Sequence, residues 1–299
     1  MRGGRARKLF VLFLMLAAAA VAAGIDRKPI HFNIGYVLEK APQYQIAELK
    51  IAYARLIHRF GTCDNIDINV TYYDSADRAM EDFISGKIQS MSGTSYLWAK
   101  KYRQILAHSS LFYIAQKGKR PYQRYLLLAA PHPAPREGKR RMLLPRGDYN
   151  ARLFLEHDTL ERYRTLPRER YRIAFTKKTS IAIYHLFFGK ADFAVVPEEA
   201  WETAMEMNPK IGKKIRVVRT SPRIFFYAAG CYSDRLTALE KERVRQANAS
   251  LKNSVLGRQL LTMIQIRGYN YTTGESFGPF IRYVESTERL RKERLGETR

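Results

Sequence analysis

One unit of structure, a helix that ends at glycine followed by a strand, a turn and a second helix, occurs twice in this 299-residue chain. The first copy spans Phe83 to Trp98 (FISGKIQSMSGTSYLW) and the second spans Phe187 to Trp201 (FFGKADFAVVPEEAW). In each copy a Gly-Lys pair ends one helix and small, polar or acidic residues open the next. Chance recurrence of the pair would not explain the shared order of elements. Since ligands of open α/β sheets bind where strands end and helices begin, we expect two similar lobes with facing turns.

The N-terminus has the order of a secretory signal peptide. Arg2, Arg5, Arg7 and Lys8 precede an apolar run over residues 9–16, and an alanine-rich stretch then ends at Ala23. An uncleaved membrane anchor is the alternative, but the apolar run is shorter than the roughly 20 residues that cross a bilayer. We therefore expect residues 1–23 to be a cleaved signal peptide and the mature protein to be exported to the periplasm.

The charge balance indicates the chemistry of the partner. The chain carries 52 lysines and arginines against 28 acids, a net charge of +24, and the mature part keeps roughly +20. Such a field attracts nucleic acid, acidic lipid or small acidic ligands, although many of the charges merely solvate the surface. Export argues against nucleic acid. We therefore expect a small anionic ligand.

Cysteine and histidine usage indicates neither a metal nor a cofactor. Cys63 and Cys231 allow one disulfide in an oxidising compartment, and either a bridge or two free thiols would fit. His58, His108 and His185 are scattered, and no Cys/His cluster has metal-binding spacing. We expect no cofactor.

Hydrophobic periodicity predicts alternating strands and helices in two groups. In the first group we expect strands at 30–37, 66–73, 88–91 and 105–109, with helices at 42–60, 74–85 and from 92. In the second group we expect strands at 125–130, 141–145, 171–175, 191–196 and 214–219, with helices at 151–163, 180–188 and from 197. A strand at 223–229 and helices at 236–250 and 256–264 then return to the first group.

The two apolar segments at 125–130 and 223–229 bracket the second group, and we interpret them as two crossings of a hinge. The prediction is an α/β fold of two doubly wound, parallel lobes joined by a two-strand hinge. Lobe one would contain residues 24–126 and 228–299, and lobe two residues 127–227. A cleft between lobes that rotate on a hinge suits a protein that closes around its ligand.

With these segments in order, the sequence resembles the periplasmic substrate-binding proteins of phosphonate, phosphite and phosphate ABC transporters, within the type II periplasmic binding proteins. The resemblance covers roughly residues 30–285 and lies in the order and spacing of IHFNIGYV, GKIQSMSGTSYLWA, YQRYLLLA, GKRRMLLP, GKADFAVVPEEAW and RIFFYAA. It implies a monomeric receptor that delivers its ligand to a membrane permease. A periplasmic sensor that signals to a membrane kinase would share this fold.

An enzyme is not expected. The sequence shows no nucleophile elbow, HExxH motif, Gly-rich phosphate loop or paired Cys/His. Glu198 and Glu199 are adjacent acids at a predicted strand end, but acids in the first turn of a helix are favoured by its dipole without any catalytic role.

One position departs from the family. Phosphonate-binding members usually carry a Ser/Thr-Ser-Gly turn after the first strand of lobe two, whereas this chain has Pro145-Arg146-Gly147-Asp148-Tyr149-Asn150. Arg146 would attract a dianion and Asp148 would repel one, so a ligand that carries an amine is the alternative.

The predicted site uses the amides and hydroxyls of helix starts, which favour anions. Its ligand-binding residues are Tyr36, Ser92, Thr94, Ser95 and Tyr96 from lobe one, and Arg146, Tyr149, Asn150 and Ser180 from lobe two. For Ser92 and for Thr179, which precedes Ser180, helix capping alone would explain the hydroxyl equally well.

Overall fold

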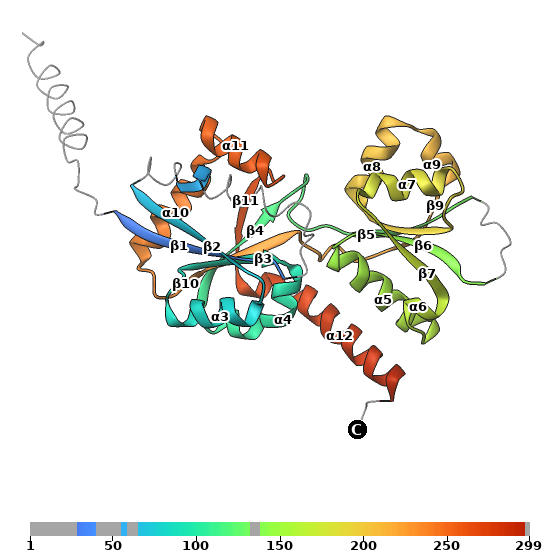
Figure 1. Ribbon diagram of the computed structural model, residues 1–299, viewed down its shortest axis with the longest axis horizontal. Helices are drawn as coiled ribbons and strands as arrows, with labels where there is room; N and C mark the ends of the chain where they lie inside the picture. Colours follow the sequence, from blue (N-terminus) through green and yellow to red (C-terminus); the bar gives the residue numbers. More distant parts are fainter. Residues whose placement is uncertain (1–28, 40–54, 59–64, 132–137, 297–299) are drawn as a thin grey trace, which may run out of the picture.

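The computed structural model describes residues 29–39, 55–58, 65–131 and 138–296. The predicted signal peptide, Cys63 and most of the predicted helix at 42–60 lie outside these residues. The described chain forms two α/β lobes side by side, each built around one sheet (Figure 1).

Lobe one contains a six-stranded sheet in the order β11-β4-β10-β3-β1-β2. Its strands are β1 (Ile30–Val37), β2 (Ile66–Tyr73), β3 (Ser90–Thr94), β4 (Ser109–Gln116), β10 (Ala228–Ser233) and β11 (Gly268–Thr272). Its helices are α3 (Ala76–Ser85), α4 (Ser95–Leu106), α10 (Ala238–Ser250), α11 (Val255–Met263), the 3-10 turn η2 (Gly274–Phe277) and α12 (Gly278–Leu295). Helices α3, α4 and α12 share one hydrophobic core, and α10 and α11 share another across the sheet.

Lobe two contains a five-stranded sheet in the order β7-β6-β8-β5-β9. Its strands are β5 (Tyr125–Ala129), β6 (Arg140–Pro145), β7 (Tyr171–Thr176), β8 (Phe193–Pro197) and β9 (Arg216–Thr220). Its helices are α5 (Tyr149–Tyr163), α6 (Pro167–Arg170), α7 (Thr179–Phe187), α8 (Glu198–Met207) and α9 (Lys210–Lys214). Both sheets are mixed, because β10 runs antiparallel to β3 and β5 runs antiparallel to β8. The parallel pairing that we predicted is confirmed for β1, β2 and β3 and for β6, β7 and β8, and it is wrong for the strands that pair with β10 and β5.

The repeated unit of the sequence is present in both lobes. Helix α3 ends at Gly86 with a φ of +84°, and α7 is followed by Gly189 with a φ of +68°, a region that glycine enters without steric cost. Strands β3 and β8 follow, and helices α4 and α8 then bury Trp98 and Trp201.

Two of the predicted strands are wrong, each for a packing reason. The segment 105–109 is mostly the end of α4, because Trp98, Tyr102 and Ile105 continue one helical face; the strand β4 begins at Ser109. Most of the segment 223–229 crosses between the lobes, and β10 begins only at Ala228. The segment 223–229 is apolar because it contains Phe225 and Phe226, which are both fully buried and do not alternate between two faces as strand residues would.

The hinge consists of the segments 117–124 and 221–227, which touch at an isolated bridge between Gln123 and Phe225. The predicted first crossing at 125–130 is wrong, because this segment is β5, which lies between β8 and β9 in the sheet of lobe two. A single hydrophobic core continues through it from one lobe to the other. Phe225 packs edge-to-face on Tyr125 of β5 at 5.3 Å between ring centroids and on Tyr283 of α12 at 5.4 Å. Phe226 packs on Trp98 at 6.2 Å. The lobes therefore share buried aromatic side chains.

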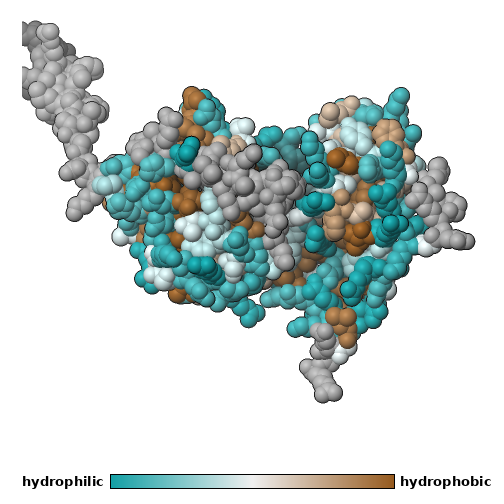
Figure 2. Space-filling view, viewed as in Figure 1, coloured by the Kyte–Doolittle hydropathy of each residue, from teal (hydrophilic) through white to brown (hydrophobic). Residues whose placement is uncertain are grey.

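Helix α12 forms a third connection, running from lobe one along α5 (Figure 1). Arg291 makes two hydrogen bonds to Glu156 of α5, at 2.6 and 2.8 Å, and the ring of His157 lies 4.1 Å from that of Tyr283. The outer surface of both lobes is mostly hydrophilic on the face in Figure 2. Among the described residues, no helix is both long enough and apolar enough to span a membrane.

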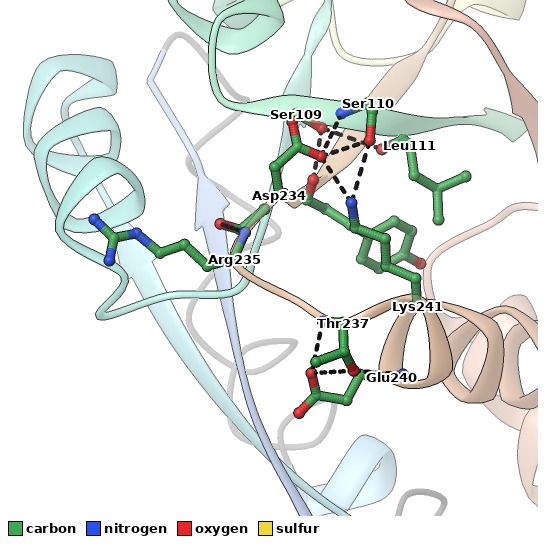
Figure 3. A network of polar contacts seen from close by, with 10 residues as sticks. Ser109, Ser110, Leu111, Asp234, Arg235, Thr237, Glu240 and Lys241 are labelled. Atoms are coloured by element: carbon green, nitrogen blue, oxygen red, sulfur yellow. Dashed lines mark hydrogen bonds and ion pairs between the residues drawn. The ribbon is translucent and has the colours of Figure 1, made fainter.

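A polar network fixes β10 at the point where it leaves the sheet (Figure 3). Asp234 accepts hydrogen bonds from the backbone amide and the hydroxyl of Ser110, and from the Lys241 ammonium at 2.7 Å. Thr237 and Glu240 form a capping box that begins α10. The network lies at the start of β4 and the end of β10, so it supports the scaffold from the edge away from the hinge.

Candidate functional site

The helices that follow β3 and β6 begin against each other where the two lobes meet. The Ser95 hydroxyl, in the first turn of α4, donates to Asn150 Oδ1 in the first turn of α5 at 2.6 Å. Asn150 Nδ2 donates to the Phe226 carbonyl of the second hinge segment at 2.9 Å. Ser95 and Asn150 are both buried. The structure thus brings these two predicted site residues together as a direct contact between the lobes.

A second predicted pair lies beside this contact. The ring of Tyr96 packs edge-to-face on that of Tyr149, with centroids 5.2 Å apart. Burial raises the pKa of both phenols, and the nearby Glu39 carboxylate adds to the rise for Tyr96. Both hydroxyls therefore stay protonated and able to donate at neutral pH.

The remaining lobe-one candidates have different surroundings. Thr94 is the N-cap residue of α4, and its side chain makes no capping hydrogen bond within the described chain. The Ser92 hydroxyl is buried and donates to the Ala229 carbonyl of β10 at 3.3 Å. Tyr36 stacks on Tyr72 at 6.0 Å and lines a cavity of about 40 Å³ that also contacts α10 and α11. Of these three, Thr94 offers a free capping position.

In the turn that follows β6 in lobe two, the Asp148 carboxylate already accepts the hydrogen bonds at the start of α5. Asp148 caps α5 by accepting from the Ala151 amide at 3.0 Å, and the Tyr125 hydroxyl donates to both of its oxygens at 3.0 Å. Burial raises the pKa of Asp148. Arg146 is exposed, and its backbone amide donates to the Thr176 carbonyl at 2.9 Å. Ser180 is exposed in the first turn of α7, and no described contact joins it to the other candidates.

Sequence reasoning missed a cluster of charged residues at the hinge, centred on Lys117. Lys117 lies over the Tyr227 ring, 4.3 Å from its centroid. Burial lowers the pKa of Lys117, and the carboxylates of Asp148 and Glu199 oppose that change. The Glu199 carboxylate also lies against the Cα of Gly118. These partners are more than 30 positions apart in sequence, so no local pattern indicated the cluster.

A second missed group ties the two hinge segments to lobe two. The guanidinium group of Arg124, in the first segment, donates a hydrogen bond to Glu198 Oε1 at 2.5 Å. The guanidinium group of Arg223, in the second segment, donates to Glu198 Oε2 at 2.5 Å. Burial alone would raise the pKa of Glu198, but the two guanidinium groups lower it below its ordinary value. Glu198, which we predicted as an acid of the first helical turn, thus forms ion pairs that join both hinge segments to α8.

The described residues contain no group of three or more His, Cys, Asp or Glu side chains that could hold a metal ion. Cys231 is a buried free thiol whose sulfur lies 3.7 Å from the Met91 carbonyl. The other cysteine of the possible disulfide, Cys63, lies outside the described residues.

Comparison with known proteins identifies a family that matches this chain. A family model for periplasmic substrate-binding proteins of phosphonate ABC transporters matches residues 40–277. No curated protein matches the chain.

Solved structures match over nearly the whole chain. A binding-protein component of an ABC phosphonate transporter from Pseudomonas aeruginosa is 10% identical over 89% of both chains, with a TM-score of 0.56. PhnD1 from Prochlorococcus marinus, in complex with methylphosphonate, is 12% identical over 89% of this chain and 100% of its own, with a TM-score of 0.56. A Xanthomonas citri protein bound to ATP is 10% identical over 88% of this chain and 98% of its own, with a TM-score of 0.57. At such low identity these likenesses establish the fold and leave the ligand open.

Proposed function

Because the chain belongs to the periplasmic substrate-binding proteins of phosphonate ABC transporters, we propose that it captures a small anionic ligand of the phosphonate or phosphate class between its lobes. The ligand would then pass to the membrane permease of such a transporter. Proteins of this family bind a substrate for transport and catalyse no reaction. The observation that carries the proposal is the meeting of the α4 and α5 starts at Ser95 and Asn150, beside the hinge.

Two physical arguments support an anion at this place. The first amides of a helix lack intrahelical partners, and the helix dipole makes its N-terminus favourable for negative charge. Thr94 leaves the start of α4 without a side-chain cap among the described residues, and Ser95 and Tyr96 follow it in the first turn. The net charge of the mature chain, roughly +20, would also speed the capture of an anion without fixing which anion binds.

The periplasmic location of the family agrees with the N-terminal pattern, and we extend the proposal accordingly. Residues 1–23 would be removed on export, and the mature chain would act as a monomer with lobe one at 24–126 and 228–299 and lobe two at 127–227. Sequencing the N-terminus of the exported protein tests the first point. A chain that retains Met1 in the inner membrane would contradict it.

Calorimetric and thermal-shift titration of the mature protein tests the function. The probes are methylphosphonate, inorganic phosphate, an alkanesulfonate, acetate and a neutral amino acid. A ligand at one hundred times its dissociation constant should add about 2.7 kcal/mol to the free energy of unfolding. We expect methylphosphonate or phosphate to bind more tightly than acetate or the amino acid. Binding of the neutral amino acid alone would refute an anion receptor.

A further inference from the structure

The edge of the lobe-two sheet that lies away from the hinge is strongly basic. Strands β6, β7, β8 and β9 all run in the same direction, and β9 ends where the second hinge segment begins. The starts of these strands therefore lie together at the opposite edge, where α7 and α8 also end, because each helix runs back toward the start of the next strand. Helix α9 lies on the side of lobe two away from lobe one (Figure 1). The segments 187–190 and 207–216 at this edge have no Asp or Glu and contain Lys190, Lys210, Lys213, Lys214 and Arg216.

Helix α9 joins the ends of α7 and α8 into one surface. Its Ile211 is buried in the core of lobe two, whereas its three lysines are exposed. The Lys214 ammonium lies over the Phe187 ring at the end of α7, 4.7 Å from the centroid, and Phe187 packs edge-to-face on Phe188 at 5.2 Å. A side chain at Gly212 would meet the sulfur of Met205, so α9 also lies directly on α8.

The charge of this surface is not neutralised by ion pairs. Among the described residues, its five cationic side chains form no ion pair with an acid, and the buried acid at this edge, Asp192, pairs with Arg140 at 3.7 Å. The exposed acid closest in sequence is Glu206, at the end of α8. The surface therefore keeps most of its positive charge for a partner outside the chain.

Two large apolar side chains are exposed among these cations. Phe188, which follows α7, is 66% exposed, and Met207, the last residue of α8, is 75% exposed. Exposed lysines alone need no partner, and a nucleic acid or another soluble polyanion would use only the cations. An anionic lipid bilayer uses both kinds of side chain, because its headgroups attract lysines and its headgroup–acyl boundary accepts Phe and Met.

We propose that this surface binds the exported protein to an anionic lipid bilayer. Its residues are Phe188, Lys190, Met207, Lys210, Lys213 and Lys214, and they would rest on the bilayer without crossing it. The contact between Ser95 and Asn150 follows the opposite ends of the lobe-two strands, so the bilayer and a small ligand would bind at different edges of lobe two. The proposal goes beyond ligand capture, because it keeps a receptor at a membrane whether or not a ligand is bound.

Flotation of the mature protein with lipid vesicles tests the charge. We expect binding to vesicles of equal parts phosphatidylcholine and phosphatidylglycerol, loss of that binding in about 1 M salt, and no binding to phosphatidylcholine alone. Each lysine at an anionic surface contributes about fivefold, so Lys213→Gln with Lys214→Gln should weaken binding about 25-fold. Lys252→Gln with Lys292→Gln removes two exposed lysines of lobe one and is the matched control, with an expected change of less than about twofold.

A second pair of variants tests the apolar side chains at constant charge. Phe188→Ser with Met207→Ser should weaken vesicle binding about tenfold and leave binding to heparin, a soluble polyanion, unchanged. All four replaced side chains are exposed, so the thermal midpoints and the affinity for methylphosphonate should stay those of the parent.

Three outcomes would overturn the proposal. In the first, the parent fails to bind the anionic vesicles. In the second, the Lys213 and Lys214 variant binds them as well as the control does. In the third, the Phe188 and Met207 variant binds them as well as the parent does, which would identify a general polyanion site. Each outcome leaves the affinity for methylphosphonate, and with it the proposed function, to be judged separately.

Discussion

Replacing Asn150 by alanine tests whether the contact between the lobes is structural. Asn150 is 4% exposed and bonds the Ser95 hydroxyl on one side and the Phe226 carbonyl on the other. The substitution leaves both groups buried without this partner, at about 1–3 kcal/mol each. We expect a loss of about 3 kcal/mol in the free energy of unfolding. For a chain of this size, that lowers the thermal midpoint by roughly 6–12 °C.

Calorimetric unfolding of Asn150→Ala, Ser95→Ala and the double variant measures the contact itself. Because the two side chains bond each other, the double variant should lose about 0.5–3 kcal/mol less than the sum of the single variants. Ser180→Ala, at an exposed hydroxyl, is the control and should change stability by less than about 0.5 kcal/mol. An Asn150→Ala protein that keeps the parent's midpoint but no longer binds the anion would refute this reasoning, since Asn150 would then serve the ligand rather than the fold.

Three shorter predictions concern other regions. Arg291→Ala removes the paired hydrogen bonds to Glu156 and should cost about 1 kcal/mol, with faster hydrogen exchange along α12; unchanged exchange would contradict it. Burial raises the pKa of Cys231 to about 12, so in a Cys63→Ser variant the folded protein should resist thiol reagents at pH 8, and rapid labelling would contradict burial. Hydrogen bonds from two lysines of α4 lower the pKa of Asp77 to about 2, so stability present at pH 5 is lost as the pH falls toward 2. Asp77→Asn should lessen this loss, and an unchanged acid profile would contradict it.

Local chemistry made much of the fold predictable. The cap at Ser75 and the glycine at Gly86 bound α3 as their residue types require. Strand alternation located β1 and β2 to the residue. The repeated unit indicated two lobes before any contact was known, because each of its steps depends on residues close in sequence.

Features that depend on distant partners were not predictable. Phe225 and Phe226 suggested a strand because both are apolar, yet they are buried by residues from both lobes. Asp148 read as a charge facing the ligand, whereas its two oxygens are held by Tyr125 and the Ala151 amide. Nothing local to Ser95 or Asn150 showed that each would bond the other. The candidate site was therefore predictable as a set of helix starts and not as a set of contacts.

The shared core limits how the lobes can move apart. Phe225 is fully buried and contacts Tyr125 in lobe two and Tyr283 in α12. A buried aromatic side chain covers 150–250 Å² of surface, and exposing it costs about 25 cal/mol per Å², or about 4–6 kcal/mol. A motion that separated these rings would use much of the 5–15 kcal/mol that typically holds a domain folded. We therefore expect ligand entry to require a rotation that keeps the Phe225 contacts, with the polar contact between Ser95 and Asn150 breaking first.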